Sequence, residues 1–233
     1  MSVFHNRRWD GDFMTLRNLV AGGMLGDVKE AVFRWDRYIP EANPDKWRDS
    51  SELGSGVLYD LGVHFFDQVL CLFGKPDQIR ADVRTLRAGT EADDYFDVTL
   101  VFQRGLNVTV KSTVLAREPG PRYVVHGTKG SFVKYGGDPQ EAALIAGRTP
   151  AENGWGKESR EAWGTLNTMV NNLHIVGKVE TMEGAYQAYY QNIYDAITGR
   201  AELIVKPEEA GMAIKLIELA LVSSREGRTV DVE

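Results

Sequence analysis

The fold of this chain is decided by residues 96–114, which read FDVTLVFQRGLNVTVKSTV. On both sides of the turn at 103–105, apolar residues alternate with mostly polar ones. This period of two is typical of β-strands with one buried face, and two such runs joined by a short turn predict a β-hairpin. One face of the hairpin should lie on helices, and it carries five apolar residues: Val98, Leu100, Phe102, Val108 and Val110.

Outside this hairpin, apolar spacing together with capping and stop residues predicts helices. They cover about residues 10–21, 56–73, 186–197 and 207–226. The rest of the pattern predicts strands over 3–6, 28–38 and 174–179, a second hairpin over 123–133, and loops over 40–47 and 136–164. Because the strands follow one another between helices, the order favours an α+β fold over a doubly wound sheet. Residues 1–233 are expected to form a single domain.

Composition is ordinary for a globular protein, with 43% apolar and 26% charged residues. The net charge of −6 argues against a nucleic-acid partner, which would favour a basic face. No apolar run approaches the roughly 18 residues of a membrane span, and the first residues lack a signal pattern. The one cysteine, Cys71, lies in the apolar run 69–73 and is predicted to be buried, which fits a reducing compartment. We therefore expect a soluble, cytoplasmic protein that binds neither nucleic acid nor membranes.

The helix predicted at 56–73 carries three ionisable residues on one side. At about 100° per residue, His64 lies about 40° from Asp60, and Asp67 lies about 20° from Asp60 on the other side. The rest of the helix is apolar almost all round, so it should be mostly buried, and buried ionisable groups are costly unless they are paired or line a cavity. A carboxylate one turn from an imidazole can orient it as a general base. Asp60 and His64 are therefore candidate catalytic residues.

Two other interpretations of this stripe remain open. Asp60 could be a carboxylate of the helix start, with His64 a core residue whose hydrogen bonds are satisfied. The spacing of Asp60, His64 and Asp67 would also permit a metal site. No second cluster of His or Glu stands near them in the sequence, so no metal is expected.

Residues 60–67 resemble a motif of a known family, the Gfo/Idh/MocA oxidoreductases (glucose–fructose oxidoreductase, inositol dehydrogenase and relatives). That family carries Asp-x-x-x-His-x-x-Asp on a helix of its second domain, and the match is position for position. Similar stretches follow in the family's order at 3–10, 25–28, 127–131 and 134–141. The resemblance covers nearly the whole chain. It implies a large, mostly antiparallel sheet with helices packed on one face, like the C-terminal domain of dihydrodipicolinate reductase.

By this resemblance, His64 is the acid/base that takes the proton from a substrate hydroxyl, while hydride leaves the same carbon for NAD or NADP. Asp60 would bind substrate hydroxyls and hold the imidazole, and Asp67 would be a structural carboxylate. The substrate would be a small molecule, a sugar or polyol.

The resemblance also suggests roles for five other residues. Arg7 and Arg8 lie where the family approaches its cofactor, although exposed salt-bridge partners would fit them equally. Arg37, Trp47 and Tyr135 are candidates for substrate binding, with loop packing favoured for Trp47. The tyrosines at 186–194 have helical spacing and are expected to pack in the core.

Two features of the family are missing from this sequence. The family begins with a Rossmann domain whose glycine-rich turn binds pyrophosphate, whereas the glycines at 22–26 follow a helix instead of opening one. The family's Glu-Lys-Pro motif is also missing, and residues 43–46 do not replace it. The sequence is therefore interpreted as the C-terminal domain of an NAD(P)-dependent oxidoreductase without its Rossmann domain. Alone it should bind no cofactor and have no activity.

The second face of the hairpin predicts association. It is only half polar, and no helix is obviously free to cover it; it carries Thr99, Val101, Asn107, Thr109, Lys111 and Thr113. A two-fold axis would let this face pack on its own copy, as the resembling family does, so a homodimer is expected. The alternative function is a stand-alone ligand-binding or assembly domain that keeps the fold without the chemistry.

Overall fold

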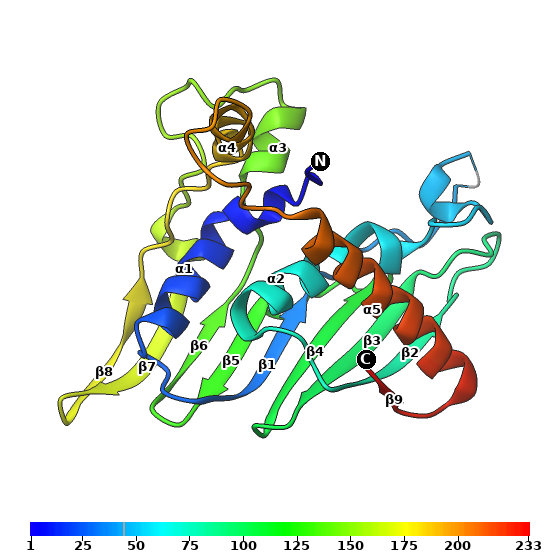
Figure 1. Cartoon of the computed structure of the whole chain (residues 1–233), viewed down its shortest axis with the longest axis horizontal. Coiled ribbons are helices and arrows are strands. Elements are labelled where there is room, and N and C mark those ends of the chain that lie inside the picture. Colours follow the sequence, from blue (N-terminus) through cyan, green and yellow to red (C-terminus); the bar gives the residue numbers. More distant parts are fainter. Residues whose placement is uncertain (44) are drawn as a thin grey trace. The chain divides into compact units, whose positions relative to one another are not determined.

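The computed structural model describes residues 1–43 and 45–233, so Pro44, in the predicted loop 40–47, lies outside the described residues. Figure 1 labels the elements along the chain. The helical elements are the 3-10 turn Asn6–Trp9, α1 (Gly11–Ala21), the 3-10 turn Trp47–Asp49, the π turn Leu58–Gly62, α2 (Val63–Phe73), α3 (Gln140–Ile145), the 3-10 turn Arg160–Ala162, α4 (Gln187–Ile197) and α5 (Pro207–Glu226). The strands are β1 (Val28–Arg34), β2 (Gln78–Arg84), β3 (Tyr95–Phe102), β4 (Leu106–Thr113), β5 (Tyr123–Gly127), β6 (Gly130–Lys134), β7 (Gly164–Val170), β8 (Leu173–Val179) and β9 (Val230–Asp231).

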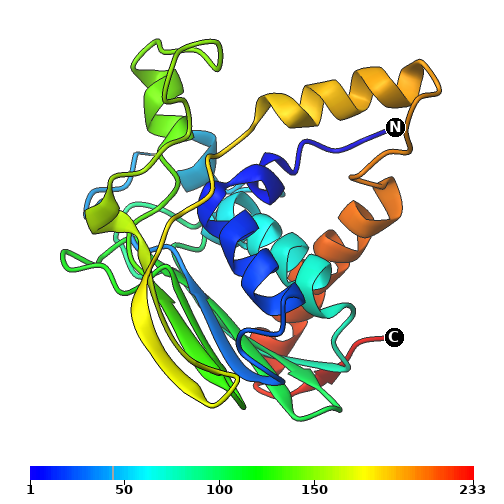
Figure 2. The same ribbon diagram turned by 90° about the vertical axis from the view of Figure 1, so that its left-hand side faces the viewer.

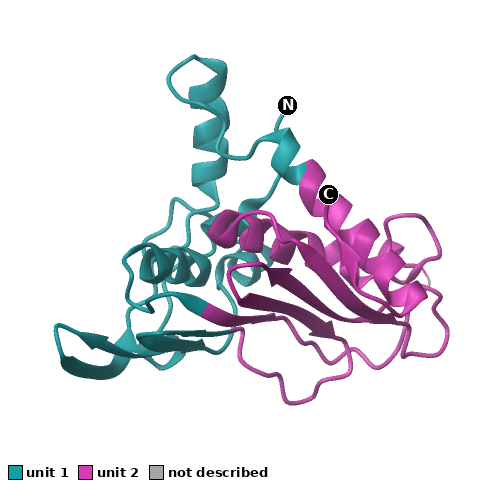
Figure 3. Ribbon diagram, turned by 60° about the horizontal axis from the view of Figure 1, so that its bottom comes forward, with its two compact units in different colours: residues 1–28, 124–210 teal, residues 29–123, 211–233 magenta. Residues whose placement is uncertain are grey.

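The chain divides into two compact units, which Figure 3 shows in different colours. Unit 1 comprises residues 1–28 and 124–210, and unit 2 comprises residues 29–123 and 211–233. Each unit combines strands, most of them paired antiparallel, with helices. The predicted α+β class is therefore confirmed.

In unit 2 the strand order is β1-β4-β3-β2-β9. β1 pairs with β4 in parallel, while β2 with β3, β2 with β9 and β3 with β4 are antiparallel. The predicted hairpin is confirmed as β3 and β4, and all five residues of its apolar face are buried. Figure 2 shows α2 and α5 on the same side of these strands. The ring of Phe65 in α2 lies 6.4 Å from that of Phe33 in β1, and Ser223 of α5 accepts a hydrogen bond from the Ala81 N–H of β2 (3.0 Å).

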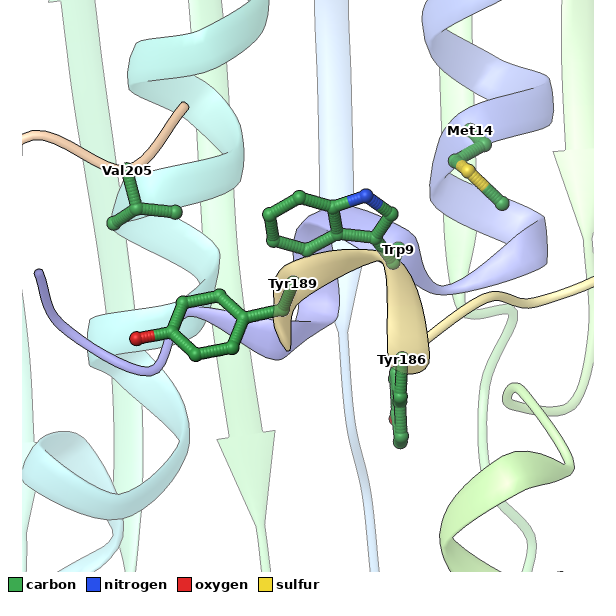
Figure 4. Packing of buried hydrophobic residues seen from close by; sticks show 5 residues of the cluster. All are labelled: Trp9, Met14, Tyr186, Tyr189 and Val205. Carbon is green, nitrogen blue, oxygen red and sulfur yellow. The ribbon is translucent and has the colours of Figure 1, made fainter. Parts of the chain in front are cut away.

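In unit 1 the strand order is β8-β7-β6-β5, and the second predicted hairpin is confirmed as β5 and β6. Figure 4 shows the apolar cluster of this unit, which consists of Trp9, Met14, Tyr186, Tyr189 and Val205. The rings of Trp9 and Tyr189 meet edge to face, with their centroids 5.8 Å apart. This cluster joins the first 3-10 turn, α1, the start of α4 and the segment before α5.

The predicted strand at 3–6 is wrong. The His5 N–H donates to the Val3 carbonyl (2.8 Å), and the chain then forms the 3-10 turn Asn6–Trp9. The three successive side chains 7–9 of that turn are all buried. A strand turns successive side chains to opposite faces, whereas a helical turn allows this burial, so the chain enters the turn at Asn6 instead of extending as a strand.

The segment 136–164, predicted as a loop, contains α3 and the 3-10 turn Arg160–Ala162. Gln140, at the start of α3, is fully buried. Its side chain donates to the carbonyl of Trp9 (3.1 Å) and accepts from Trp155 Nε1 (3.0 Å) and from the Tyr186 N–H (2.8 Å). These long-range bonds stabilise a short helix inside a stretch rich in glycine and proline. Strands β2, β7 and β9 were also not predicted, and β1 ends at Arg34 instead of near Tyr38.

Two predictions of burial are wrong. Cys71 is exposed, because the apolar run 69–73 winds around the last turn of α2 and only one face of that helix meets the sheet. Of the tyrosines near α4, Tyr186 and Tyr189 are buried but Tyr190 and Tyr194 are exposed, because only one side of this helix packs on the cluster around Trp9. In the described part of the chain, none of the helices has both the length and the apolar character needed to cross a bilayer.

Candidate active site

The helix that carries the candidate catalytic pair begins against the loop before β3. The Leu58 N–H donates to Oδ2 of Asp93 (2.7 Å), and the Val57 N–H donates to the Asp93 carbonyl (2.9 Å). The first N–H groups of a helix have no partners within it, so Asp93 caps this one. Gly56 permits the approach, since its φ is +91° and a Cβ there would lie 2.1 Å from Asp93 Oδ1. The cap is therefore Asp93, which sequence reasoning missed, and not Asp60.

The first turn of this helix is the π turn Leu58–Gly62, and α2 continues from Val63. A π turn closes i→i+5 hydrogen bonds, so the regular 100° spacing applies only from Val63 onward. Asp60 therefore lies in a different kind of turn from His64 and Asp67, which corrects the single straight helix predicted for 56–73. Within α2, Asp67 is buried and His64 is partly exposed. Such π turns occur frequently at functional sites.

The Asp60 carboxylate lies between two arginines. Arg48 Nε is 2.8 Å from Asp60 Oδ2, and a terminal nitrogen of Arg37 is 3.8 Å from the same oxygen. The Asp60 side chain is 13% exposed, while Arg37 is 27% and Arg48 46% exposed. Arg37 was predicted as a site residue, and the structure brings it to Asp60. Arg48 was not predicted, because an arginine in a polar loop carries no local signal.

Aromatic rings support both arginines. The Arg48 guanidinium lies 5.5 Å from the ring centre of Trp47, and the Arg37 guanidinium lies 5.6 Å from that of Trp35. These are cation–π distances, which favour a fixed orientation of each guanidinium. Trp47 is half exposed, so one side of its ring contacts Arg48 while part of the residue faces solvent.

A buried arginine packs behind the His64 helix. The Arg122 guanidinium lies 4.2 Å from the ring centre of Trp35, 4.8 Å from that of Phe65 and 5.0 Å from that of Tyr123. The hydroxyl of Tyr123 donates to Gln68 of α2 (3.0 Å). These contacts hold the face of α2 that lies on the sheet, and they leave His64 on a side of the helix that is partly exposed.

The other predicted site residues belong to unit 1. Both arginines there are buried: Arg7 pairs with Glu141 (2.6 Å), and Arg8 pairs with Glu209 (2.7 Å). Each arginine thus has a salt-bridge partner, as the alternative interpretation expected, although both arginines are buried instead of exposed. Their role toward a cofactor stays a prediction. Tyr135 follows β6 and is exposed. Unit 2 thus collects Arg37, Trp47, Asp60 and His64, while unit 1 carries Arg7, Arg8 and Tyr135.

This arrangement suits the binding of hydroxyl groups and the transfer of a proton. A carboxylate accepts hydrogen bonds, guanidinium groups donate them, and an imidazole can do either. Asp60 faces cations, which is unlike a metal ligand. Within residues 1–43 and 45–233, no three His, Cys, Asp or Glu side chains converge as a metal-binding group.

Comparison with known proteins assigns the family. Residues 17–232 match the oxidoreductase family described as the GFO_IDH_MocA C-terminal alpha/beta domain. This chain belongs to that family. It is 40% identical over 233 residues to the scyllo-inositol 2-dehydrogenase (NADP(+)) of Bacillus subtilis, covering all of this chain and 64% of that protein. The inositol 2-dehydrogenase of Rhizobium meliloti is 28% identical over 156 residues, which is 63% of this chain and 45% of that protein.

Solved structures agree with the fold. An oxidoreductase structure from Bacillus subtilis superposes with a TM-score of 0.94 at 40% identity, covering 100% of this chain and 66% of that one. One from Yersinia pestis gives a TM-score of 0.92 at 42% identity, covering 100% and 64%. The chain therefore spans about two thirds of the length of the relatives that it matches.

Proposed function

We propose that this chain is the substrate-binding and catalytic part of an NAD(P)-dependent oxidoreductase that acts on a sugar or polyol. The observation that carries the proposal is the Asp60 carboxylate held by Arg37 and Arg48, four residues before His64. The name of the Bacillus subtilis relative, a scyllo-inositol 2-dehydrogenase, supports a substrate with several hydroxyl groups. Such a substrate needs acceptors and donors side by side, which this group of side chains provides.

Each side chain then has a distinct role. His64 takes the proton from the hydroxyl that is oxidised, as a general base. Asp60 accepts a hydrogen bond from a hydroxyl of the substrate. Arg37 and Arg48 orient the Asp60 carboxylate and donate hydrogen bonds to substrate oxygens. Trp47 offers an apolar surface to the C–H groups of the sugar or polyol substrate, as is usual in sites for small molecules. Tyr135 remains a proposed substrate residue in unit 1.

NAD or NADP, when bound, accepts the hydride from the carbon. The side chains of the site fit a reaction that uses such a cofactor. Carboxylate, imidazole and guanidinium groups can bind hydroxyls and move protons, but they cannot accept a hydride. Arg7 and Arg8 keep their proposed role toward the nucleotide, which would have to share them with Glu141 and Glu209. We propose that most contacts to the nucleotide come from the Rossmann domain typical of this family. The isolated chain should therefore bind neither cofactor and should be inactive.

The test joins this chain to the part of the Bacillus subtilis relative that it does not match, giving a fusion enzyme. We expect the fusion enzyme to reduce NAD or NADP with scyllo-inositol or a related polyol. The isolated chain should reduce neither cofactor. A fusion enzyme that binds the polyol and the cofactor but transfers no hydride would instead support a non-catalytic binding domain. Micromolar binding of either cofactor by the isolated chain would contradict the proposed division of labour.

We also propose a homodimer in the cytoplasm, formed through the open face of β3 and β4. The alternate residues on that face are partly exposed, among them Val101 and Thr99. Light scattering should give twice the 26.0 kDa mass of the chain at tens of micromolar. Val101→Glu should shift the mass to that of a monomer, whereas Ile197→Glu, an exposed position on α4, should not. A wild-type chain that is monomeric under these conditions would rule the dimer out.

A further inference from the structure

Arg87 lies buried between two segments of unit 2, with its side chain only 3% exposed. Its Nε donates to Asp94 Oδ2 (2.9 Å), and one terminal nitrogen lies 2.5 Å from Asp49 Oδ1. The other terminal nitrogen donates to the carbonyls of Ile39 (3.3 Å) and Glu41 (3.1 Å). A guanidinium has five N–H groups in a fixed plane. Here they join the loop 39–49 to the connection between β2 and β3.

Asp94 holds Arg87 from the side of the sheet. The Asp94 carboxylate is fully buried and accepts hydrogen bonds from the backbone N–H groups of Leu86 (2.6 Å) and Arg87 (3.0 Å). The Asp94 N–H donates to the carbonyl of Arg84, the last residue of β2 (3.0 Å). Arg87 thus links Asp94 to Asp49, and the Asp94 end of this link is fixed to the strands.

Asp49 is the other end of the link, and it closes the 3-10 turn Trp47–Asp49. Besides Arg87, its carboxylate accepts from the Asn43 N–H (2.8 Å), and its carbonyl accepts from the hydroxyl of Thr90 (2.8 Å). The carbonyl of Arg48, in the middle of the turn, accepts from the Gly56 N–H (3.1 Å). The backbone of this turn is thus held from several sides.

Arg48 lies in the middle of this turn, and its side chain extends from it. Its side chain is half exposed and long, and it reaches Asp60 from the turn that Asp49 closes. We propose that Arg87 is a positioning residue: through Asp49 it fixes the turn Trp47–Asp49, so that Arg48 presents its guanidinium to Asp60 and to a substrate hydroxyl. The substrate in this statement rests on the proposed function, whereas the link between Arg87 and the turn does not.

Hydrogen exchange on the 233-residue chain tests the link without any substrate. Arg87→Lys keeps the charge but loses the planar fork that reaches Asp49 and Asp94 together. We expect the amides of residues 43 and 45–56 to exchange at least 10-fold faster, with β3 and β4 unchanged. The matched control is Arg84→Lys, an exposed arginine that pairs with Asp82, which should change neither region. A folded Arg87→Lys protein whose loop exchanges at the wild-type rate would overturn the proposal.

A second variant keeps the test decisive if Arg87→Lys does not fold, because removing one partner of a buried charged pair is strongly destabilising. Asp49→Ala removes both acceptor oxygens on the loop side and leaves the pair of Arg87 with Asp94 in place. It should accelerate exchange at residues 43 and 45–56 as Arg87→Lys does. Wild-type exchange in Asp49→Ala would reject the proposal equally.

The kinetic test uses the fusion enzyme with scyllo-inositol as the probe. Arg87→Lys and Arg48→Gln should each raise KM about 10-fold or more and change kcat by less than about 3-fold. The double variant should be no worse than Arg48→Gln alone, since Arg87 acts through Arg48. Additive effects, or a fall in kcat with unchanged KM, would contradict a positioning role. If the fusion enzyme shows no activity on any polyol, the proposed function fails, while the exchange experiment still decides the link.

Discussion

Two groups of charged side chains, one in each unit, are arranged differently. In unit 1, Lys134 pairs with Glu158 at 3.0 Å, and these side chains are only 1% and 4% exposed. Lys134 also donates to the carbonyl of Tyr135 (2.8 Å). In unit 2, two partly exposed arginines, Arg37 and Arg48, share the carboxylate of Asp60. The first arrangement is closed, while the second leaves donors that water or a ligand can reach.

The difference separates charges that stabilise the fold from charges that can bind. A buried pair has already lost its water, so removing one partner leaves an uncompensated charge in the interior. A partly exposed pair contributes little to stability, because solvent screens it. We therefore expect substitutions in the buried pair of unit 1 to destabilise the fold strongly, and substitutions in the Asp60 cluster to change function with little loss of stability.

The largest expected effect is on catalysis. In the fusion enzyme, His64→Ala should lower kcat by roughly 10²–10⁴-fold, the usual contribution of a general base. Folding should survive, since His64 is partly exposed. The matched control is His174→Ala, an exposed histidine of β8 that bonds to Asn167. Steady-state kinetics with saturating polyol measures both, and near wild-type turnover in His64→Ala would leave His64 as a packing residue.

Lys134→Met tests the buried pair of unit 1. It should lower the free energy of unfolding by about 3–5 kcal/mol, because Glu158 would keep its charge without its partner. Urea denaturation of the isolated chain, followed by circular dichroism, measures the change. The double variant Lys134→Met with Glu158→Leu should recover much of the loss, since it removes the stranded charge. A loss below about 1 kcal/mol in the single variant would mean that this buried pair contributes no more to stability than an exposed pair does.

One carboxyl in each unit should make stability depend on pH. Burial raises the pKa of Asp93 in unit 2 to about 6, and burial together with the charge of Asp12 raises the pKa of Asp138 in unit 1 to about 6. Both groups hold a proton more tightly in the folded chain than in the unfolded chain. Their contribution is therefore complete below the unfolded pKa of 3.8 and is lost as the pH rises through about 6.

The free energy of unfolding should consequently fall by about 1 kcal/mol for each group between pH 5 and pH 7.5. Urea denaturation at the two pH values gives the slope. Asp93→Asn and Asp138→Asn should each remove about half of it, and Asp231→Asn, at an exposed position on β9, should remove none. Stability that rises over this interval would show that the backbone hydrogen bonds to these carboxylates outweigh their burial.

Local patterns account for what could be predicted from the sequence. The hairpin of β3 and β4 was predicted because its period of two repeats over eight residues on each side of a short turn. The ends of α1 and α2 were marked by the glycines that follow them. Asp60 and His64 were proposed as site residues from their spacing and from the resemblance to the family motif, although the π turn changes the angle assumed between them.

Contacts between distant segments account for what was missed. Asp93 caps a helix that begins 35 residues earlier, and Arg87 pairs with Asp49 across 38 residues. No periodicity connects such positions. Strand β2 was missed because charged residues interrupt its apolar ones, and only pairing with β3 specifies it as a strand. The arginine that contacts Asp60 most closely belongs to this class, since Arg48 reaches it from a polar loop.

Arg48→Met has the smallest expected effect on stability, but it should have a clear effect on substrate binding. The change should cost less than about 1 kcal/mol of unfolding free energy, because the Arg48 side chain is half exposed and screened by solvent, and Arg37 stays beside Asp60. In the fusion enzyme, however, KM for the polyol should rise about 10-fold or more, since Asp60 loses its nearest cation and the substrate loses a donor. Arg148→Met is the matched control, because Arg148 is 45% exposed and pairs with Glu152 at 3.0 Å, close to the 46% and 2.8 Å of Arg48 and Asp60. It should leave both stability and KM unchanged. If the two variants behave alike in the kinetic assay, the half-exposed arginine beside Asp60 is an ordinary surface charge, and the assignment of this cluster to substrate binding is wrong.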